Sequence, residues 1–242
     1  MTSPVPPAAA TRAGELAASL AVLRARVDAA AAAAGRDAGE LTLVAVTKTW
    51  PASDAALLAG LGVQDLGESR EQELRAKTTS LAPDHPGVRW HFLGRLQGNK
   101  ARSVGALAGV VHSLDREALC APLVRGAAQA GHPPPGVLVQ VSLDGDPTRG
   151  GVLPAEAPTL AAAAVEAGLT VLGVMAVAPA AEPARPAFAR LRDTAELLRD
   201  RHPGATWISA GMSGDLEDAV LEGATHLRVG TALLGGRRPS GH

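Results

Sequence analysis

Short apolar segments alternate with helix-forming segments along almost the whole chain, and no other feature restricts the possible folds as strongly. The short segments contain many β-branched residues, are too short for buried helices and are bounded by turn residues. They predict strands at 41–46, 63–66, 88–93, 109–112, 137–143, 170–175, 205–209 and 225–229. The segments around them predict helices at 12–34, 52–60, 69–80, 98–108, 115–130, 154–167, 184–201 and 214–222. Such alternation favours parallel strands joined by right-handed crossovers.

This order of elements predicts an α/β fold class, a single (β/α)8 TIM barrel with an extra N-terminal helix. Eight βα units in 242 residues fit the usual size of that barrel. An open doubly wound sheet is the alternative, but it usually has a glycine-rich turn after its first strand, and residues 47–51 contain no glycine. We expect the barrel to cover 12–236, between a disordered N-terminal tail at 1–11 and a flexible C-terminal tail at 237–242.

Local signals mark the ends of two of the predicted helices. Gly35 follows the first helix, and glycine there is a common C-terminal signal because it adopts a left-handed backbone easily. Ser69 and Gln72 have the spacing of a capping box, in which each side chain accepts a backbone hydrogen bond at the start of a helix. We therefore expect Ser69 to open the helix at 69–80.

The composition excludes several classes of function. A formal net charge of −1 argues against a broad nucleic-acid-binding surface. A single cysteine rules out an intramolecular disulfide and a cysteine-based metal cluster. We expect a cytoplasmic protein without a membrane anchor, because no stretch approaches ~20 apolar residues and the N-terminus does not resemble a signal peptide. The chain has no tyrosine, so a mechanism that needs a phenol is excluded unless a partner supplies it.

Lys48 is the most informative single residue, because it directly follows the first predicted strand. The chain has only three lysines and twenty arginines, so it rarely uses lysine for solubility. A buried amine at the end of a barrel strand would be desolvated, which lowers its pKa and frees it as a nucleophile that can form a Schiff base. The alternative is a lysine that extends from the barrel mouth into water. Lys77 is expected to be solvated on a polar helix face, and Lys100 to be a surface residue.

Two glycine-rich segments follow the last two predicted strands, at 209–215 and 228–232. TIM barrels often bind phosphate at these positions through backbone N–H groups and hydroxyls, which Ser213 and Thr231 supply here. The alternative is that Ser213 only caps the helix at 214–222 and that the glycines make tight turns. Together with a lysine after the first strand, the segments suggest a phosphorylated carbonyl compound, and pyridoxal phosphate is the common cofactor of that kind.

Two histidines, His91 and His112, lie at the ends of predicted strands. Neither has a second histidine or a carboxylate at the spacing that metal sites use, so we expect no metal site and a structural role for both. Cys120 lies in an Ala/Leu-rich helix and is expected to be a small core residue.

A series of motifs covers about 35–238, nearly all of the predicted barrel. In chain order they are Leu43-Val-Ala-Val-Thr-Lys-Thr49, Gly67-Glu-Ser-Arg-Glu-Gln-Glu73, Trp90-His-Phe-Leu-Gly-Arg-Leu-Gln-Gly-Asn-Lys100, His112-Ser-Leu-Asp115, Val139-Gln-Val141, Gly173-Val-Met175, Gly211-Met-Ser-Gly-Asp215 and Arg228-Val-Gly-Thr-Ala232. They resemble the pyridoxal-phosphate-binding homeostasis proteins, a family related to the barrel domain of alanine racemase. Ser69 stands where that family usually has Asn, and Arg149 where it usually has lysine.

The resemblance implies a role for each residue of a cofactor site. Lys48 would hold pyridoxal 5'-phosphate as a Schiff base. Arg228 would face the pyridine nitrogen, where a cation disfavours protonation and makes the cofactor a poorer electron sink. The phosphate would be bound by Ser209, Met212 (through its backbone), Ser213, Gly230 and Thr231.

The resemblance also implies a function, that of a carrier or regulator in intracellular pyridoxal phosphate homeostasis without robust turnover. Its partners would be pyridoxal-phosphate-dependent apoenzymes, and we expect a monomer. An amino-acid racemase and a lyase that uses Lys48 on a substrate carbonyl are the alternatives. In alanine racemase a tyrosine of the neighbouring subunit supplies the second base, whereas this chain has no tyrosine.

Overall fold

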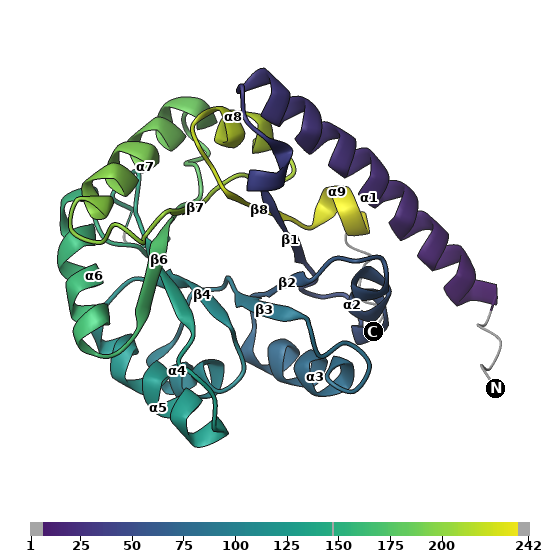
Figure 1. Cartoon of the computed structure of the whole chain (residues 1–242), viewed down its shortest axis with the longest axis horizontal. Coiled ribbons are helices and arrows are strands. Elements are labelled where there is room, and N and C mark those ends of the chain that lie inside the picture. Colours follow the sequence, from purple (N-terminus) through teal and green to yellow (C-terminus); the bar gives the residue numbers. More distant parts are fainter. Residues whose placement is uncertain (1–6, 147, 237–242) are drawn as a thin grey trace.

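The computed structural model describes residues 7–146 and 148–236, and within them eight parallel strands close into a barrel in the order β1 to β8 (Figure 1). The strands are β1 (Thr42–Val46), β2 (Asp65–Glu68), β3 (Arg89–Phe92), β4 (Val110–Leu114), β5 (Gly136–Gln140), β6 (Thr170–Met175), β7 (Trp207–Ser209) and β8 (His226–Val229). The barrel closes because β1 pairs with both β2 and β8. The predicted (β/α)8 barrel is therefore confirmed.

Helices form a ring outside the strands (Figure 1). The helices are α1 (Pro7–Ala33), α2 (Ala52–Gly60), α3 (Glu71–Leu81), α4 (Gly98–Gly105), α5 (Cys120–Ala130), α6 (Ala157–Glu166), α7 (Ala184–Arg199), α8 (Leu216–Leu221) and α9 (Thr231–Leu234). Short 3-10 helices lie at Ala38–Glu40, Glu117–Leu119 and Pro154–Glu156. The main core packs leucine, valine and alanine side chains between strands and helices, and it includes the buried Cys120.

The structure corrects several predicted boundaries. The first helix begins at Pro7, so the last five residues of the expected tail at 1–11 are helical, while 1–6 and 237–242 lie outside the described residues. The capping box is wrong, because α3 starts at Glu71 after Arg70, and no side chain caps it. Gly35 does end the first helix, with φ of 66° and a hydrogen bond from its N–H to Ala32.

The strand register decides which side chains enter the barrel lumen. Residues paired across neighbouring parallel strands point to the same face, and successive residues alternate between faces. Arg228 pairs with Val44 in β1, and Val46 pairs with Gly67 in β2. Arg228 contacts β7 from within the lumen, so even-numbered residues of β1 face inward. Lys48 follows β1 in the turn at 47–50, so it lies at the C-terminal end of an inward-facing strand position, two residues after Val46.

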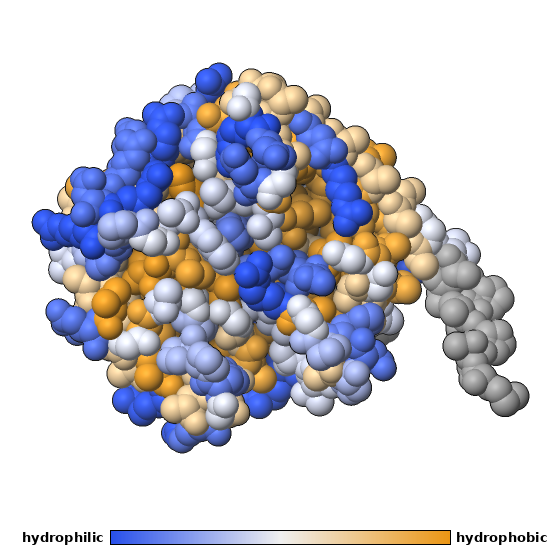
Figure 2. All heavy atoms as spheres, viewed as in Figure 1, coloured by the Kyte–Doolittle hydropathy of each residue, from blue (hydrophilic) through white to orange (hydrophobic). Residues whose placement is uncertain are grey.

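The long helix α1 lies outside the barrel against α8, α9 and α2 (Figure 1). Its leucines at 16, 20 and 23 are buried against the core, as their helical spacing predicts. Much of its exposed surface is alanine, which gives α1 its pale orange colour along one edge of the molecule in Figure 2. Among the residues that the structure describes, no helix combines the length and apolarity needed to span a bilayer.

Candidate cofactor site at the C-terminal mouth

The loops after β7 and β8 meet at the C-terminal mouth of the barrel. Gly211 has φ of 87°, and a Cβ at this position would lie 2.7 Å from the Cβ of Ala219, so only glycine fits there without strain. The Ser213 hydroxyl accepts a hydrogen bond of 3.1 Å from the N–H of Ala232, which follows Gly230 and Thr231. The structure thus brings the two predicted phosphate-binding segments together.

The interpretation of Ser213 as a helix cap does not hold in this structure. Helix α8 begins at Leu216 after Asp215, with no side-chain cap, and the Ser213 hydroxyl bonds to the other loop instead. Asp215 has a different role. Its carboxylate accepts a hydrogen bond of 2.6 Å from the N–H of Met212, the backbone group that the resemblance assigns to the phosphate. A phosphate bound by this N–H would therefore have to displace the Asp215 carboxylate.

Helix α1 supports the β7–α8 loop from outside the barrel. Arg26 donates a hydrogen bond of 2.8 Å to the carbonyl of Ser213, and its guanidinium also forms an ion pair with Glu217 in α8. The ion pair raises the pKa of Arg26 and lowers that of Glu217. The extra N-terminal helix is thus joined directly to a candidate phosphate-binding loop.

Arg228 and Ser209 lie inside the barrel and contact each other. Arg228 donates a 2.6 Å hydrogen bond to the Ser209 hydroxyl and a 2.8 Å hydrogen bond to the carbonyl of Ala176. Burial lowers the pKa of Arg228 to about 10, against the effect of the nearby Asp215 carboxylate, so the guanidinium is charged at neutral pH. Ser209 is fully buried and also bonds to His112 at 2.8 Å.

Lys48 is exposed, which corrects the prediction of a buried, desolvated amine. Among the described residues it has no hydrogen-bond or ion-pair partner. The turn that carries it is held by a hydrogen bond of 3.0 Å from the N–H of Trp50 to the Thr47 carbonyl. Thr49 has φ of 68° there, a backbone region that costs threonine about 1–2 kcal/mol. The N–H of Thr49 donates a 2.6 Å hydrogen bond to Glu73. An exposed amine on a turn held by hydrogen bonds is suited to react with a carbonyl carbon.

A buried cluster between β1, β2 and α3 holds the other side of this turn, and it corrects the prediction of a solvated Lys77. Lys77 is only 4% exposed and donates hydrogen bonds to the Thr47 carbonyl at 2.7 Å and to Glu68 at 2.5 Å. Glu68 also accepts a 2.5 Å hydrogen bond from the Thr47 hydroxyl. Burial raises the pKa of Glu68, although the bonds from Lys77 and Thr47 act against this. Lys77 also lies 3.6 Å from Glu73.

The sequence pattern did not identify this cluster. The α3 segment reads Glu-Gln-Glu-Leu-Arg-Ala-Lys, in which Lys77 looks like one more member of a polar face. The sequence does contain one indication of a charged cluster. Lys77 follows Glu73 by four residues, which is ion-pair spacing on a helix, and Glu68 lies on the preceding strand. The burial of Lys77 results from the packing of α3 on the barrel.

This chain is similar to proteins of a known family. The family profile described as "Alanine racemase, N-terminal domain" matches residues 18–238. The pyridoxal phosphate homeostasis protein of Mycobacterium tuberculosis is 44% identical over 244 residues, which cover 94% of this chain and 95% of the relative. That of Pseudomonas aeruginosa is 42% identical over 226 residues, which cover 92% and 96%. The chain belongs to the pyridoxal phosphate homeostasis proteins of the alanine racemase N-terminal domain family.

A solved structure is also similar to this family member. PipY of Synechococcus elongatus, in a structure described as having PLP bound, is 34% identical and superposes with a TM-score of 0.78. The match covers 91% of this chain and all of PipY. The family resemblance that the motifs indicated is therefore confirmed.

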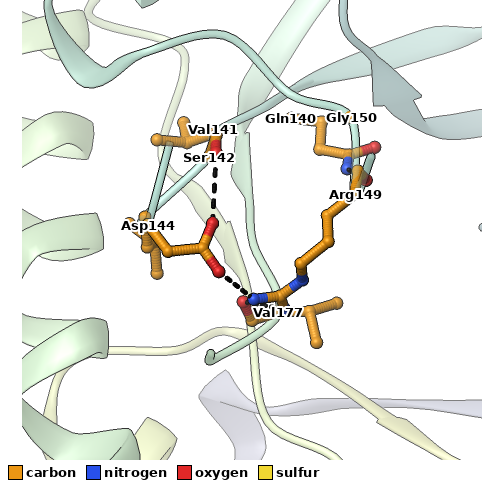
Figure 3. A pocket seen from close by; sticks show the side chains of 8 residues that line it. Gln140, Val141, Ser142, Asp144, Arg149, Gly150 and Val177 are labelled. Carbon is orange, nitrogen blue, oxygen red and sulfur yellow. Dashed lines mark hydrogen bonds and ion pairs between the residues drawn. The ribbon is translucent and has the colours of Figure 1, made fainter. Parts of the chain in front are cut away.

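A pocket of about 210 Å³ at the ends of β5 and β6 is lined in part by Arg149 (Figure 3). Its guanidinium forms an ion pair with Asp144 and donates 3.0 Å hydrogen bonds to the carbonyls of Val177 and Ala178. The bonds to Asp146 and Arg149 lower the pKa of Asp144. Arg149 thus joins the β5–α6 and β6–α7 loops beside the mouth. Among the described residues no cluster of histidine, cysteine and carboxylate side chains could hold a metal ion.

Proposed function

We propose that this chain binds pyridoxal 5'-phosphate through Lys48 and acts as a carrier in pyridoxal phosphate homeostasis. The observation that carries the proposal is the exposed amine of Lys48, on a turn after β1 and next to the strand that bears Arg228. Within the part of the chain that the structure describes, this amine has no hydrogen-bond or ion-pair partner. The names of the curated relatives and the PLP-bound state of PipY support the same cofactor. When bound, pyridoxal phosphate supplies an aldehyde that reacts with amines and a ring that withdraws electrons.

The donors at the mouth fit this cofactor. The Lys48 amine would bind the aldehyde carbon covalently with release of water. The hydroxyls of Ser213 and Thr231 and the backbone N–H groups of Met212 and Gly230 would bind the phosphate dianion. They lie on two loops that the Ser213–Ala232 hydrogen bond already holds together.

Arg228 would lie opposite the pyridine nitrogen, as the family resemblance implies. Its guanidinium is charged at neutral pH and has no proton acceptor to offer, so it would keep that nitrogen unprotonated. An unprotonated ring withdraws electrons less strongly, which disfavours the removal of a substrate proton. The absence of tyrosine from the chain also removes the second base of an alanine-racemase mechanism. Both features support a carrier without robust turnover.

We further propose that the protein acts in the cytoplasm as a monomer and that its partners are pyridoxal-phosphate-dependent apoenzymes. The chemistry of the exposed amine supports the proposal of apoenzyme partners. An exposed amine at an open barrel mouth leaves the aldehyde carbon accessible to an amine of an acceptor protein, which could replace Lys48 by exchange.

Absorption spectroscopy tests the binding proposal. Wild-type protein titrated with pyridoxal 5'-phosphate should develop a visible band, and Lys48→Ala should abolish it. Lys100→Ala is the matched control, because Lys100 is a partly exposed lysine paired only at 3.8 Å with Glu71, and it should keep the band. A wild-type protein without the band, or a Lys48→Ala variant that retains it, would contradict the proposal.

A turnover assay separates the carrier from a racemase. Amino acids deuterated at the α-carbon, incubated with the loaded wild-type protein, should keep their deuterium over many hours. Loss of the label at rates near 1 s⁻¹, the lower end of ordinary enzyme turnover, would instead establish an enzyme.

A further inference from the structure

A chain of hydrogen bonds crosses the lumen below the candidate cofactor site. At the first residue of β2, the Asp65 carboxylate contacts Nε2 of His91 at 2.8 Å, and Nδ1 of His91 contacts Nε2 of His112 at 2.8 Å. Nδ1 of His112 then contacts the Ser209 hydroxyl at 2.8 Å, and Ser209 accepts the bond from Arg228. Because β4 and β7 are not neighbours in the barrel, the contact between His112 and Ser209 spans the lumen.

The chemistry of these residues determines which atom donates the hydrogen in each bond of this hydrogen-bond chain. Burial alone would raise the pKa of Asp65, but hydrogen bonds from His91 and Arg89 lower it to about 2, so at neutral pH the carboxylate can only accept. Nε2 of His91 must therefore carry the proton.

Both histidines are neutral, so the donor and acceptor nitrogens of His112 can be assigned as well. Burial lowers the pKa of His91 despite the opposing effect of Asp65. Burial also lowers the pKa of His112 well below its ordinary value, and the charge of Arg228 adds to this effect. Nδ1 of a neutral His91 is an acceptor, so Nε2 of His112 donates to it. Nδ1 of His112 is then an acceptor as well, and among the described residues the hydrogen that it accepts is that of the Ser209 hydroxyl.

From this geometry we propose that Ser209 is a positioning residue for Arg228 and not a phosphate ligand. Its single hydroxyl hydrogen is committed to His112, and its oxygen lone pair accepts from the Arg228 guanidinium. Asp65, His91 and His112 set this orientation from the far side of the lumen. The inference rests on the proposed function only where it says that Arg228 faces the bound ring, since the hydrogen-bond direction is a property of the free protein.

The alternative role of Ser209, that of a phosphate donor, requires a free hydroxyl hydrogen. The hydrogen-bond chain would leave the Ser209 hydroxyl hydrogen free only if the direction of every bond were reversed. Asp65 would then be protonated, and both histidines would carry hydrogen on Nδ1. The low pKa of Asp65 disfavours this arrangement at neutral pH. A role in phosphate binding and a role in positioning Arg228 therefore predict opposite tautomers of His112.

Nitrogen-15 NMR of the wild-type protein without cofactor tests the direction of the chain. At neutral pH His91 and His112 should each carry hydrogen on Nε2 and have an unprotonated Nδ1, with the signals assigned from His91→Gln and His112→Gln. Protonation of His112 on Nδ1 would overturn the proposal. No variant of Ser209 is needed, and a failure of cofactor binding would not affect this measurement.

Titration with two ligands tests the consequence for the site. Ser209→Ala should weaken binding of pyridoxal 5'-phosphate and of pyridoxal, which lacks the phosphate, by the same factor of about five. Ser213→Ala should weaken only the phosphorylated ligand by about that factor. Ser113→Ala is the matched control, because Ser113 is equally buried in β4 and its hydroxyl has no described partner, so both affinities should stay within about twofold. A loss in Ser209→Ala that is confined to pyridoxal 5'-phosphate would overturn the proposal.

Discussion

At the scale of single residues, the three lysines show what the sequence could and could not predict. The position after the first strand identified Lys48 correctly as the lysine at the barrel mouth. Its expected desolvation was wrong, because the side chain lies in the open mouth, while Lys77 is buried by the packing of α3 against β1 and β2. Burial of a charged residue depends on which helix face meets the barrel, and a mostly polar helix such as α3 gives little periodicity from which to predict it.

The buried pair of Lys77 and Glu68 leads to a prediction about stability. Lys77→Met should lower the free energy of unfolding by about 3–5 kcal/mol, because it leaves the Glu68 carboxylate buried without its cation. Adding Glu68→Gln should recover part of the loss, since the amide is neutral. Urea unfolding of both variants measures the effect. A Lys77→Met protein as stable as the wild type would show that the pair contributes little.

At the scale of elements, the eight strands were predicted within a few residues, and the errors have physical causes. The strand expected at 63–66 is Asp65–Glu68, because Val63 packs in the core before the strand begins and Gly67 and Glu68 continue the pairing. The strand expected at 137–143 ends at Gln140, where the β5–α6 loop that contains Arg149 begins. The short helix α9 was not predicted, since four residues carry no periodic signal.

The link between α1 and the β7–α8 loop gives a prediction at this scale. Arg26→Ala should weaken pyridoxal 5'-phosphate binding about three- to tenfold, because the loop that carries Ser213 loses its external hydrogen bond. Stability should change by less than about 1 kcal/mol, since the Glu217 ion pair is partly exposed. Arg24→Ala, which removes an exposed arginine of the same helix, should change neither quantity. Equal cofactor affinity in Arg26→Ala and wild type would contradict the supporting role of α1.

At the scale of the whole molecule, the lumen predicts an unusual response to acid. Burial lowers the pKa of His226 to about 3, with the charge of Arg89 adding to the effect, and burial also lowers the pKa values of His91 and His112. The unfolded chain takes up these protons near pH 6.5, whereas the folded chain does not, so stability falls as the pH falls from about 6.5 toward 3. The carboxylate of Asp65 adds a further loss only between about pH 4 and 2.

Chemical unfolding at several pH values measures this slope. Each buried histidine contributes up to about 1.4 kcal/mol per pH unit, and His226→Gln should reduce the slope between pH 6 and about 4 by roughly that amount. Constant stability of the wild type over this range would show that the lumen histidines are protonated in the folded protein.

The barrel and the positions of Lys48 and of the two glycine-rich loops at its C-terminal end could be predicted from the sequence, because each follows directly from the order of the strands along the chain. The lumen chain could not, since Asp65, His91, His112 and Ser209 come from four strands and meet only through the register of the closed barrel. The candidate site therefore has two parts. The surface loops can be recognised from sequence motifs, whereas the hydrogen-bond chain in the lumen can be recognised only from the closed barrel.

Borohydride reduction followed by peptide mapping tests the central claim most directly. The wild-type protein is loaded with pyridoxal 5'-phosphate, reduced and digested, and the modified peptide is identified by mass spectrometry. We predict that the label is on Lys48 alone, at close to one equivalent, with Lys77 and Lys100 unmodified. A label on Lys100 or Lys77, or no stable label on Lys48, would contradict the assignment of the barrel mouth as the cofactor site.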